Sequence, residues 1–295
     1  MRVAGSGCTV PGHNRNGGVN VPVGALTPTD MEAVADLVYR RSGIRLNESK
    51  HALVTARLQK RVRLGGFDSF GAYIAHVTRD PDGAECRAMI DALTTNKTSF
   101  FREREHYDFL VTHVVPEVLG RNAANGIAGW SAGCATGEEP YSLAMTLLDG
   151  TRGTPSCSIE VVATDLSTAA LSTAAAGVYP RDRVADVPHE VLRRYFERGV
   201  GADEGRVRVH AEVRRLVRFE HRNILEMRHF ARPRDFIWCR NTLMYFDQHA
   251  RQHALSCFEA NLAPGGFFFL SHAENLTTLK HDLRQVAPAV YRRPV

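Results

Sequence analysis

The sequence WSAGCATGEEPYS at positions 130–142 predicts a strand that ends in a turn of small residues and leads directly into a helix. Small side chains allow a ligand to lie against the backbone, and the first turn of a helix offers N–H groups without helical partners. The turn lacks the G-x-G-x-x-G spacing of dinucleotide-binding loops, and it is not a P-loop, because no Lys-Ser or Lys-Thr pair follows. In an open α/β sheet, this carboxyl end of a strand is where a ligand is expected.

Glu138 and Glu139, at the start of the predicted helix, restrict the charge of that ligand. Two carboxylates would repel a pyrophosphate, but they would suit positive charge, such as the sulfonium and α-amino groups of S-adenosylmethionine. The alternative is an ordinary tight turn whose acidic residues only favour the helix dipole.

Short apolar strands alternate with helices after this turn, a pattern typical of a parallel sheet covered on both faces. Strands are expected over 126–131, 158–164, 235–240 and 267–271, and helices over 138–149, 167–176 and 248–261. Asp165 follows the second strand, where a carboxylate can accept hydrogen bonds from both hydroxyls of a ribose. The alternative role of Asp165 is to cap the helix that follows it.

The rest of the chain divides into three further parts. Residues 1–25 are rich in Gly, Asn and Pro and predict a disordered leader. Residues 26–94 show helical periodicity, beginning with a capping-box pattern at Thr29, and predict a small all-helical domain. Residues 95–295 form the α/β domain, in which alternating residues at about 199–222, bounded by glycines, predict a small antiparallel insertion.

The composition of the 295 residues, 44% hydrophobic and 23% charged, fits a folded protein of about two domains. No apolar run approaches the roughly 20 residues that cross a bilayer, so no membrane insertion is expected. Six widely spaced cysteines without a Cys-x-x-Cys pair favour reduced thiols in the cytoplasm. His249, His253 and Cys257 recur at helical spacing without a His-Glu-x-x-His motif, so no metal is expected.

Two further segments place polar side chains near the predicted site. In TTNKTSFFRE at 94–103, the planar fork of Arg102 could grip a carboxylate, or it could pair with a nearby acid such as Glu105. In CRNTLMYFD at 239–247, Asn241 and Tyr245 would face the same cleft as the small-residue turn. The alternative places Tyr245 in the core and Asn241 in a turn.

Together these segments resemble the CheR family of chemotaxis protein-glutamate O-methyltransferases, from about residue 26 to the end. The combination is TTN-x-T-x-FFRE, W-x(5)-TGEEPYS, ATD, CRN-x(3)-YFD, a Pro-Gly-Gly strand and HAEN at 272–275. The chain departs from the family pattern at Lys97, Ser271 and Ala273. The resemblance implies a Rossmann-like S-adenosylmethionine-dependent methyltransferase domain with a small antiparallel β insertion, preceded by an all-helical N-terminal domain.

The resemblance also implies an activity: methyl transfer to glutamate side chains of chemoreceptors, giving methyl esters and S-adenosylhomocysteine, without a metal. Arg102 and Tyr245 fall where the family's transfer site has its polar groups. A glutamate with a pKa of about 4.3 is already ionised at neutral pH, so no general base is required. The positions implied to bind the cofactor are Asn96, Thr98, Arg102, Glu139, Asp165, Asn223, Ile224, Asn241 and Thr242.

Two segments are expected to recognise the receptor. Eight basic residues against one acid lie between Arg40 and Arg63, and a helical wheel groups Lys50 with Arg57, Lys60 and Arg61 on one face. This face suits an acidic receptor coiled coil, and the alternative is a merely solvated surface. The glycines of GVGADEG, Gly199, Gly201 and Gly205, match the loop with which some family members bind a pentapeptide at the receptor's C-terminus.

Two other functions compete with this interpretation. An S-adenosylmethionine enzyme acting on RNA would use the basic helix to follow phosphates, but the aromatic residues that stack on single-stranded bases are not interleaved with the basic ones. A non-catalytic scaffold that docks receptors is disfavoured by the presence of Arg102, Asn241 and Tyr245 together. No nucleic-acid partner is therefore expected.

Overall fold

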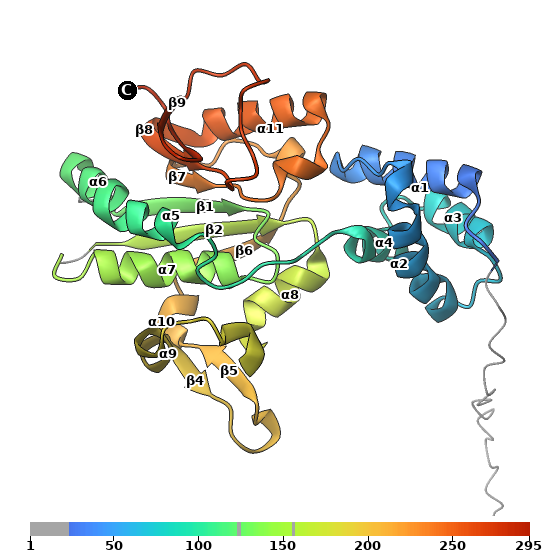
Figure 1. Cartoon of the computed structure of the whole chain (residues 1–295), viewed down its shortest axis with the longest axis horizontal. Helices are drawn as coiled ribbons and strands as arrows, with labels where there is room; N and C mark the ends of the chain where they lie inside the picture. Colours follow the sequence, from blue (N-terminus) through green and yellow to red (C-terminus); the bar gives the residue numbers. More distant parts are fainter. Residues whose placement is uncertain (1–23, 123–124, 155–156) are drawn as a thin grey trace, which may run out of the picture.

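A computed structural model describes residues 24–122, 125–154 and 157–295 of the chain. The leader predicted at residues 1–25 therefore lies outside the described residues, except for Gly24 and Ala25. Figure 1 shows two parts, a helical domain and a larger α/β domain, with the helical domain beside the ends of strands β1 and β2. Among the described helices, none is long and apolar enough to cross a membrane.

The N-terminal domain contains four α-helices around one apolar core. Thr27 caps the first helix, its hydroxyl accepting from the Asp30 N–H, while the Asp30 carboxylate accepts from the Thr27 N–H. The predicted capping box at Thr29 was placed two residues too late, because Pro28 is suited to the first helical turn. The helices are α1 (Pro28–Ser42), α2 (His51–Leu64), α3 (Phe70–Arg79) and α4 (Ala84–Leu93).

The α/β domain is built on a seven-stranded sheet in the order β6-β2-β1-β7-β8-β10-β9. The five strands from β6 to β8 are parallel, and β10 runs antiparallel to both β8 and β9. The strands are β1 (Ile127–Ala132), β2 (Ile159–Asp165), β6 (Val217–His221), β7 (Arg234–Trp238), β8 (Leu262–Phe269), β9 (Arg284–Ala287) and β10 (Val290–Arg292).

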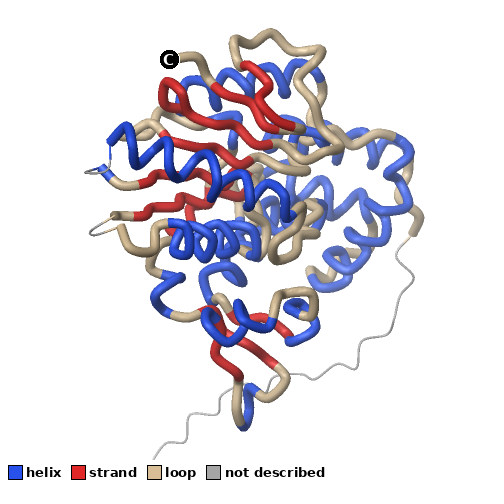
Figure 2. Tube along the Cα trace, turned by 60° about the vertical axis from the view of Figure 1, so that its left-hand side comes forward, coloured by secondary structure: helices blue, strands red, loops and turns tan. Residues whose placement is uncertain are grey.

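Helices cover both faces of this sheet, as Figures 1 and 2 show. In β7, Phe236 and Trp238 enter the core shared with α5, α6 and α7, whereas Ile237 enters the core shared with α11. Alternate residues of a strand thus fill different cores, which explains its continuous apolar run. The helices are α5 (Arg104–Phe109), α6 (Val115–Asn122), α7 (Glu138–Gly150), α8 (Thr168–Ala176) and α11 (Gln248–Asn261).

The antiparallel insertion lies earlier in the chain than predicted. Its three strands are β3 (Val178–Pro180), β4 (Phe196–Arg198) and β5 (Arg206–Val209), in the order β3-β5-β4, with α9 (His189–Tyr195) and α10 (Ala211–Arg214) beside them. The predicted range of 199–222 was wrong for its last strand, because β6 pairs in parallel with β2 of the main sheet. β6 is an edge strand with exposed residues, so its alternation resembles that of an antiparallel strand.

Candidate active site

A cavity of about 440 Å³ lies where the helical domain meets the carboxyl ends of β1, β2 and β7. This volume is within the range of small-molecule sites. The residues predicted to bind a cofactor, and Tyr245 with them, all line it; their binding roles stay predictions. The lining residues from those segments are Asn96, Thr98, Arg102, Gly133, Ala135, Glu139, Asp165, Asn223, Ile224, Asn241, Thr242 and Tyr245.

The small-residue turn after β1 brings its backbone close to the facing segments. Gly133 has a φ of 81°, and a Cβ added there would fall 2.4 Å from Thr242 Oγ1. The N–H groups of Gly133 and Cys134 donate to the Thr164 carbonyl at 2.8 and 3.0 Å. A glycine is therefore required for both the backbone angle and the close approach.

Asp165 ends β2 beside this turn and fixes it. Its Oδ2 accepts from the Ala135 N–H and its Oδ1 from the Ser167 N–H, each at 2.8 Å. Burial raises the pKa of Asp165, and these backbone donors oppose that rise. The N-cap of α8 is Ser167, whose hydroxyl accepts from the Ala170 N–H, so the cap role considered for Asp165 belongs to Ser167. Each carboxylate oxygen of Asp165 keeps a second lone pair for a ligand hydroxyl.

The two glutamates at the start of α7 have different surroundings. Glu138 is buried and accepts from the Thr136 hydroxyl and from Arg183 of the insertion, and it does not line the cavity. Glu139 lines the cavity and accepts from the Ser131 hydroxyl at 2.9 Å. Burial raises the pKa of Glu139 to about 7, against the lowering effect of Arg240. Of the two carboxylates expected to face a cationic ligand, only Glu139 lines the cavity.

Arg102 projects from a strained segment between the domains. Its neighbours Phe101 and Glu103 both adopt left-handed backbone angles, with φ of 51° and 55°, which non-glycine residues rarely do. Such angles cost about 1–3 kcal/mol each and are retained where surrounding contacts fix them. The Phe101 N–H donates to the Ser142 hydroxyl at 3.0 Å. Arg102 itself is exposed and lines the cavity, with Nη1 3.5 Å from the Lys97 carbonyl.

The segment after β7 is held by a residue that the sequence analysis did not select. Glu274 accepts from the backbone N–H groups of Asn241 and Met244, at 2.8 and 3.1 Å, and from the Ser271 hydroxyl at 3.0 Å. Asn241 has a φ of 54°, a strained angle that this contact stabilises. The HAEN motif that contains Glu274 was the available signal, although its role was left open.

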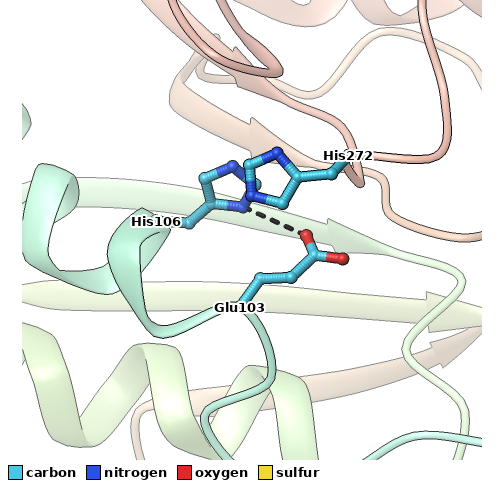
Figure 3. A group of neighbouring side chains, drawn as sticks. All are labelled: Glu103, His106 and His272. Atoms are coloured by element: carbon cyan, nitrogen blue, oxygen red, sulfur yellow. Dashed lines mark ion pairs between the residues drawn. The ribbon is translucent and has the colours of Figure 1, made fainter.

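A partly buried cluster of titratable side chains lies beside the cavity. Figure 3 shows the Glu103 carboxylate directed at His106, with His272 next to the His106 ring. Glu103 also lies 3.2 Å from the guanidinium of Arg240, a residue of the CRN motif that the sequence analysis passed over. In the described part of the chain, Glu103, His106 and His272 are the group whose geometry could hold a metal ion. Burial and Arg240 lower the pKa of His106 to about 4, so its imidazole is neutral at pH 7.

Two arginines of the basic face predicted on α2 contact acceptors within the helical domain. Arg57 donates to the Leu93 and Thr94 carbonyls at 2.8 and 2.9 Å, and Arg61 pairs with Glu85 at 2.5 Å. Lys60 is exposed. A helical wheel cannot show these contacts, because their acceptors come from α4 and the residues after it. Receptor binding by Arg57, Lys60 and Arg61 stays a prediction. Several cations line the cavity: Arg45, Lys50, Lys97, Arg102, Arg222 and Arg240.

The glycines predicted to bind a receptor peptide lie between β4 and β5 of the insertion. Gly201 and Gly205 have φ of 61° and 82°, and Val200 between the first two glycines is 82% exposed. A Cβ on Gly199 would fall 2.0 Å from the Asp203 carbonyl oxygen, so this loop folds tightly on itself. Figures 1 and 2 show the hairpin extending away from the main sheet. Peptide binding stays a prediction.

The arrangement suits S-adenosylmethionine. Gly133 lets the turn after β1 lie directly against Thr242 of the cavity lining, Asp165 can accept from ribose hydroxyls, and Glu139 offers a buried carboxylate to a cationic group. Comparison with known families decides the assignment: the model of the CheR methyltransferase SAM-binding domain matches residues 96–291, and that of the CheR all-alpha domain matches residues 29–94. The chain belongs to the CheR methyltransferase family. The resemblance inferred from the motifs is thereby confirmed, and so is the predicted fold class.

Curated relatives of this CheR-family chain match along most of their length. It is 40% identical over 266 residues to chemotaxis protein methyltransferase 2 of Pseudomonas aeruginosa, covering 90% of this chain and 93% of that protein. It is 37% identical over 268 residues to the chemotaxis protein methyltransferase of Escherichia coli, covering 90% and 91%. The match therefore includes both the helical domain and the α/β domain.

Proposed function

We propose that this CheR-family protein methylates glutamate side chains of chemoreceptors, giving glutamate methyl esters and S-adenosylhomocysteine. The observation that carries the proposal is the single cavity in which Glu139, Asp165, Arg102 and Tyr245 meet at the junction of the two domains. Relatives named chemotaxis protein methyltransferases support the receptor as substrate.

The cofactor would be held by residues from four segments. When bound, S-adenosylmethionine supplies a methyl group activated by its sulfonium centre. Asp165 would accept from the ribose hydroxyls, and Glu139 would attract the cationic amino-acid end. The other predicted cofactor-binding residues on the cavity lining are Asn96, Thr98, Asn223, Ile224, Asn241 and Thr242. The N–H contacts of Gly133 and Ala135 to Thr164 and Asp165 keep the turn in one shape before the ligand arrives.

The acceptor needs orientation more than activation. A glutamate carboxylate is ionised at neutral pH, so this chain need not remove a proton from it. The exposed guanidinium of Arg102 would orient the carboxylate, and Tyr245 would donate a hydrogen bond beside it. Correct alignment and exclusion of water can contribute about 7–11 kcal/mol to the rate. A tight ion pair would instead stabilise the ground state, so a loose contact with Arg102 is expected.

The receptor would be recognised at the cavity mouth. Arg45, Lys50 and Lys97 line the cavity, and Lys60 lies on the exposed side of α2. Such cations attract an acidic helical segment at low ionic strength and less so when salt screens them.

The test uses tritiated S-adenosylmethionine and a panel of chemoreceptor cytoplasmic fragments. Alkali treatment of the labelled product should release tritiated methanol, because methyl esters are base-labile. Base-stable label in added RNA, with no ester on the receptor fragments, would contradict the proposal. Binding of the fragments without any label would indicate a docking scaffold instead.

We further propose that the loop of Gly199, Gly201 and Gly205 binds a receptor's C-terminal pentapeptide. β4 is an edge strand of the small sheet, and the exposed Val200 follows it. An extended peptide can add to such an edge through backbone hydrogen bonds. Calorimetry with the peptide NWETF should show saturable heat, and absence of heat at high peptide concentration would contradict the tether.

A further inference from the structure

Arg240 is a buried cation that lies between two carboxylates beside the cavity. Its side chain is 1% exposed, and its Nη2 lies 3.2 Å from Glu103 Oε2. Its Nη1 lies 3.9 Å from Glu139 Oε2, which is too far for a hydrogen bond. The nitrogens of this guanidinium have no hydrogen-bond partner among the described residues. Arg240 is thus closer to Glu103, but it remains within ionic reach of Glu139.

The surroundings of Glu103 leave Arg240 as its main positive partner. His106 Nδ1 lies 3.5 Å from Glu103 Oε2, but the buried imidazole is neutral at pH 7. His272 directs its Nε2 to Glu105 at 2.6 Å (Figure 3 shows the ring beside His106). A metal ion bound by Glu103 and the two histidines would compete with the guanidinium for the same oxygen, so the arginine is the better-supported cation.

Glu139 faces few other groups. The charged neighbours that act on it are Arg240, Glu103 and Arg102, and its hydrogen bond comes from the Ser131 hydroxyl. If Glu103 carried no charge, Glu139 would be the nearest carboxylate left for Arg240. The guanidinium would then move toward Glu139 and form an ion pair that balances the negative charge of this carboxylate.

We propose that Glu103 is a positioning residue that holds Arg240 away from Glu139, so that Glu139 stays free for the cationic amino-acid end of the cofactor. The inference rests on the cofactor position proposed above. Glu103 would touch neither cofactor nor acceptor and would act only through Arg240. The left-handed backbone of Glu103 is the cost of turning its carboxylate inward, while the adjacent Arg102 is exposed and lines the cavity.

The test is calorimetric titration of the full-length chain with S-adenosylhomocysteine between pH 6 and 8.5. Glu103→Gln should weaken binding about tenfold at pH 8, equivalent to about 1.4 kcal/mol. It should also flatten the decline in affinity toward pH 6, because an Arg240–Glu139 pair keeps Glu139 ionised. Glu105→Gln is the matched control: it removes the same charge two residues away, where the partner is His272, and should bind like the wild type.

A double-mutant cycle distinguishes an effect of Glu103 that acts through Arg240 from a general disturbance of the structure. In an Arg240→Met background, Glu103→Gln should have no further effect on affinity. Glu103→Asp, which keeps the charge, should retain a wild-type pH dependence, and it serves as the test variant if Glu103→Gln does not fold. Wild-type affinity and pH profile in Glu103→Gln, an equal loss in the Arg240→Met background, or a flat profile in Glu103→Asp would overturn the proposal. Failure of the wild type to bind S-adenosylhomocysteine would instead overturn the cofactor site itself.

Discussion

A Cβ atom on Gly133 would fall 2.4 Å from the hydroxyl oxygen of Thr242, so the turn after β1 touches the segment after β7 with no room for a side chain. Gly133→Ala should therefore push the two segments apart and weaken S-adenosylhomocysteine binding more than tenfold. Its left-handed backbone adds a stability cost of about 1–2 kcal/mol. Binding is measured by calorimetry and stability by urea unfolding.

Gly153 provides the control for this substitution. Its φ of 82° matches the 81° of Gly133, but a Cβ there would meet no atom of the described residues within 4 Å. Gly153→Ala should lose similar stability and keep wild-type affinity. Equal affinities in the two variants would show that the contact with Thr242 does not shape the binding site.

Cofactor affinity should depend on pH through Glu139. Burial raises the pKa of Glu139 to about 7, so the carboxyl group is neutral below that pH and attracts a cationic ligand only above it. The affinity for S-adenosylhomocysteine should fall as the pH drops from 8 to 6. Glu139→Gln should bind weakly and show no such dependence, and an equally steep decline in that variant would assign the pH effect to another group.

The same pKa shift predicts the opposite trend for the stability of the ligand-free protein. Between its ordinary pKa of 4.5 and about 7, Glu139 binds more protons in the folded than in the unfolded state. Its contribution to the free energy of unfolding is thus fully present below pH 4.5 and is lost as the pH rises through 7. His106, whose pKa is lowered to about 4, acts in the other direction, so the measurement is the difference between wild type and Glu139→Gln.

Site residues that depend on local sequence pattern could be predicted, whereas contacts between segments far apart in the chain could not. Glu139 and Asp165 could be assigned because each follows a strand end, and the carboxyl ends of parallel strands meet at one edge. The ionic contact of Glu103 with Arg240 joins residues far apart in the chain, and periodicity carries no information on such a pair. For the same reason β6 was assigned to the insertion, since alternation alone does not show which sheet an edge strand joins.

Arg102 should be required for methyl transfer but not for folding. Its side chain is exposed at the cavity and makes no ion pair among the described residues, so Arg102→Ala should leave the melting temperature unchanged. Loss of a charged group that orients the acceptor should lower the rate of ester formation by about 10²–10³. Arg102→Lys should keep only part of the wild-type rate, because an ammonium lacks the planar fork of a guanidinium.

Release of base-labile tritiated methanol measures this rate. Arg104→Ala is the control, since Arg104 is an exposed cation two residues further along the chain that does not line the cavity. Near wild-type ester formation in Arg102→Ala would remove this residue from the transfer step.

Lys60 and Arg61 are adjacent cations on α2, and their substitution should have different effects. Arg61 lies 3.0 and 2.5 Å from the two oxygens of Glu85, which also accepts from the Tyr73 hydroxyl. Arg61→Ala should lower the free energy of unfolding by about 1–3 kcal/mol, because it removes charged hydrogen bonds from a half-buried acid. Lys60 is exposed, so Lys60→Ala should keep the stability and raise the KM for receptor fragments.

Salt separates these two effects. The KM increase of Lys60→Ala should shrink at high ionic strength, where the wild type loses the same surface attraction. The stability loss of Arg61→Ala should persist there, because its ion pair is partly buried. Steady-state kinetics and urea unfolding at low and high salt measure both quantities. A wild-type KM in Lys60→Ala at low salt would exclude Lys60 from receptor binding and leave Arg45, Lys50 and Lys97 as the recognition cations.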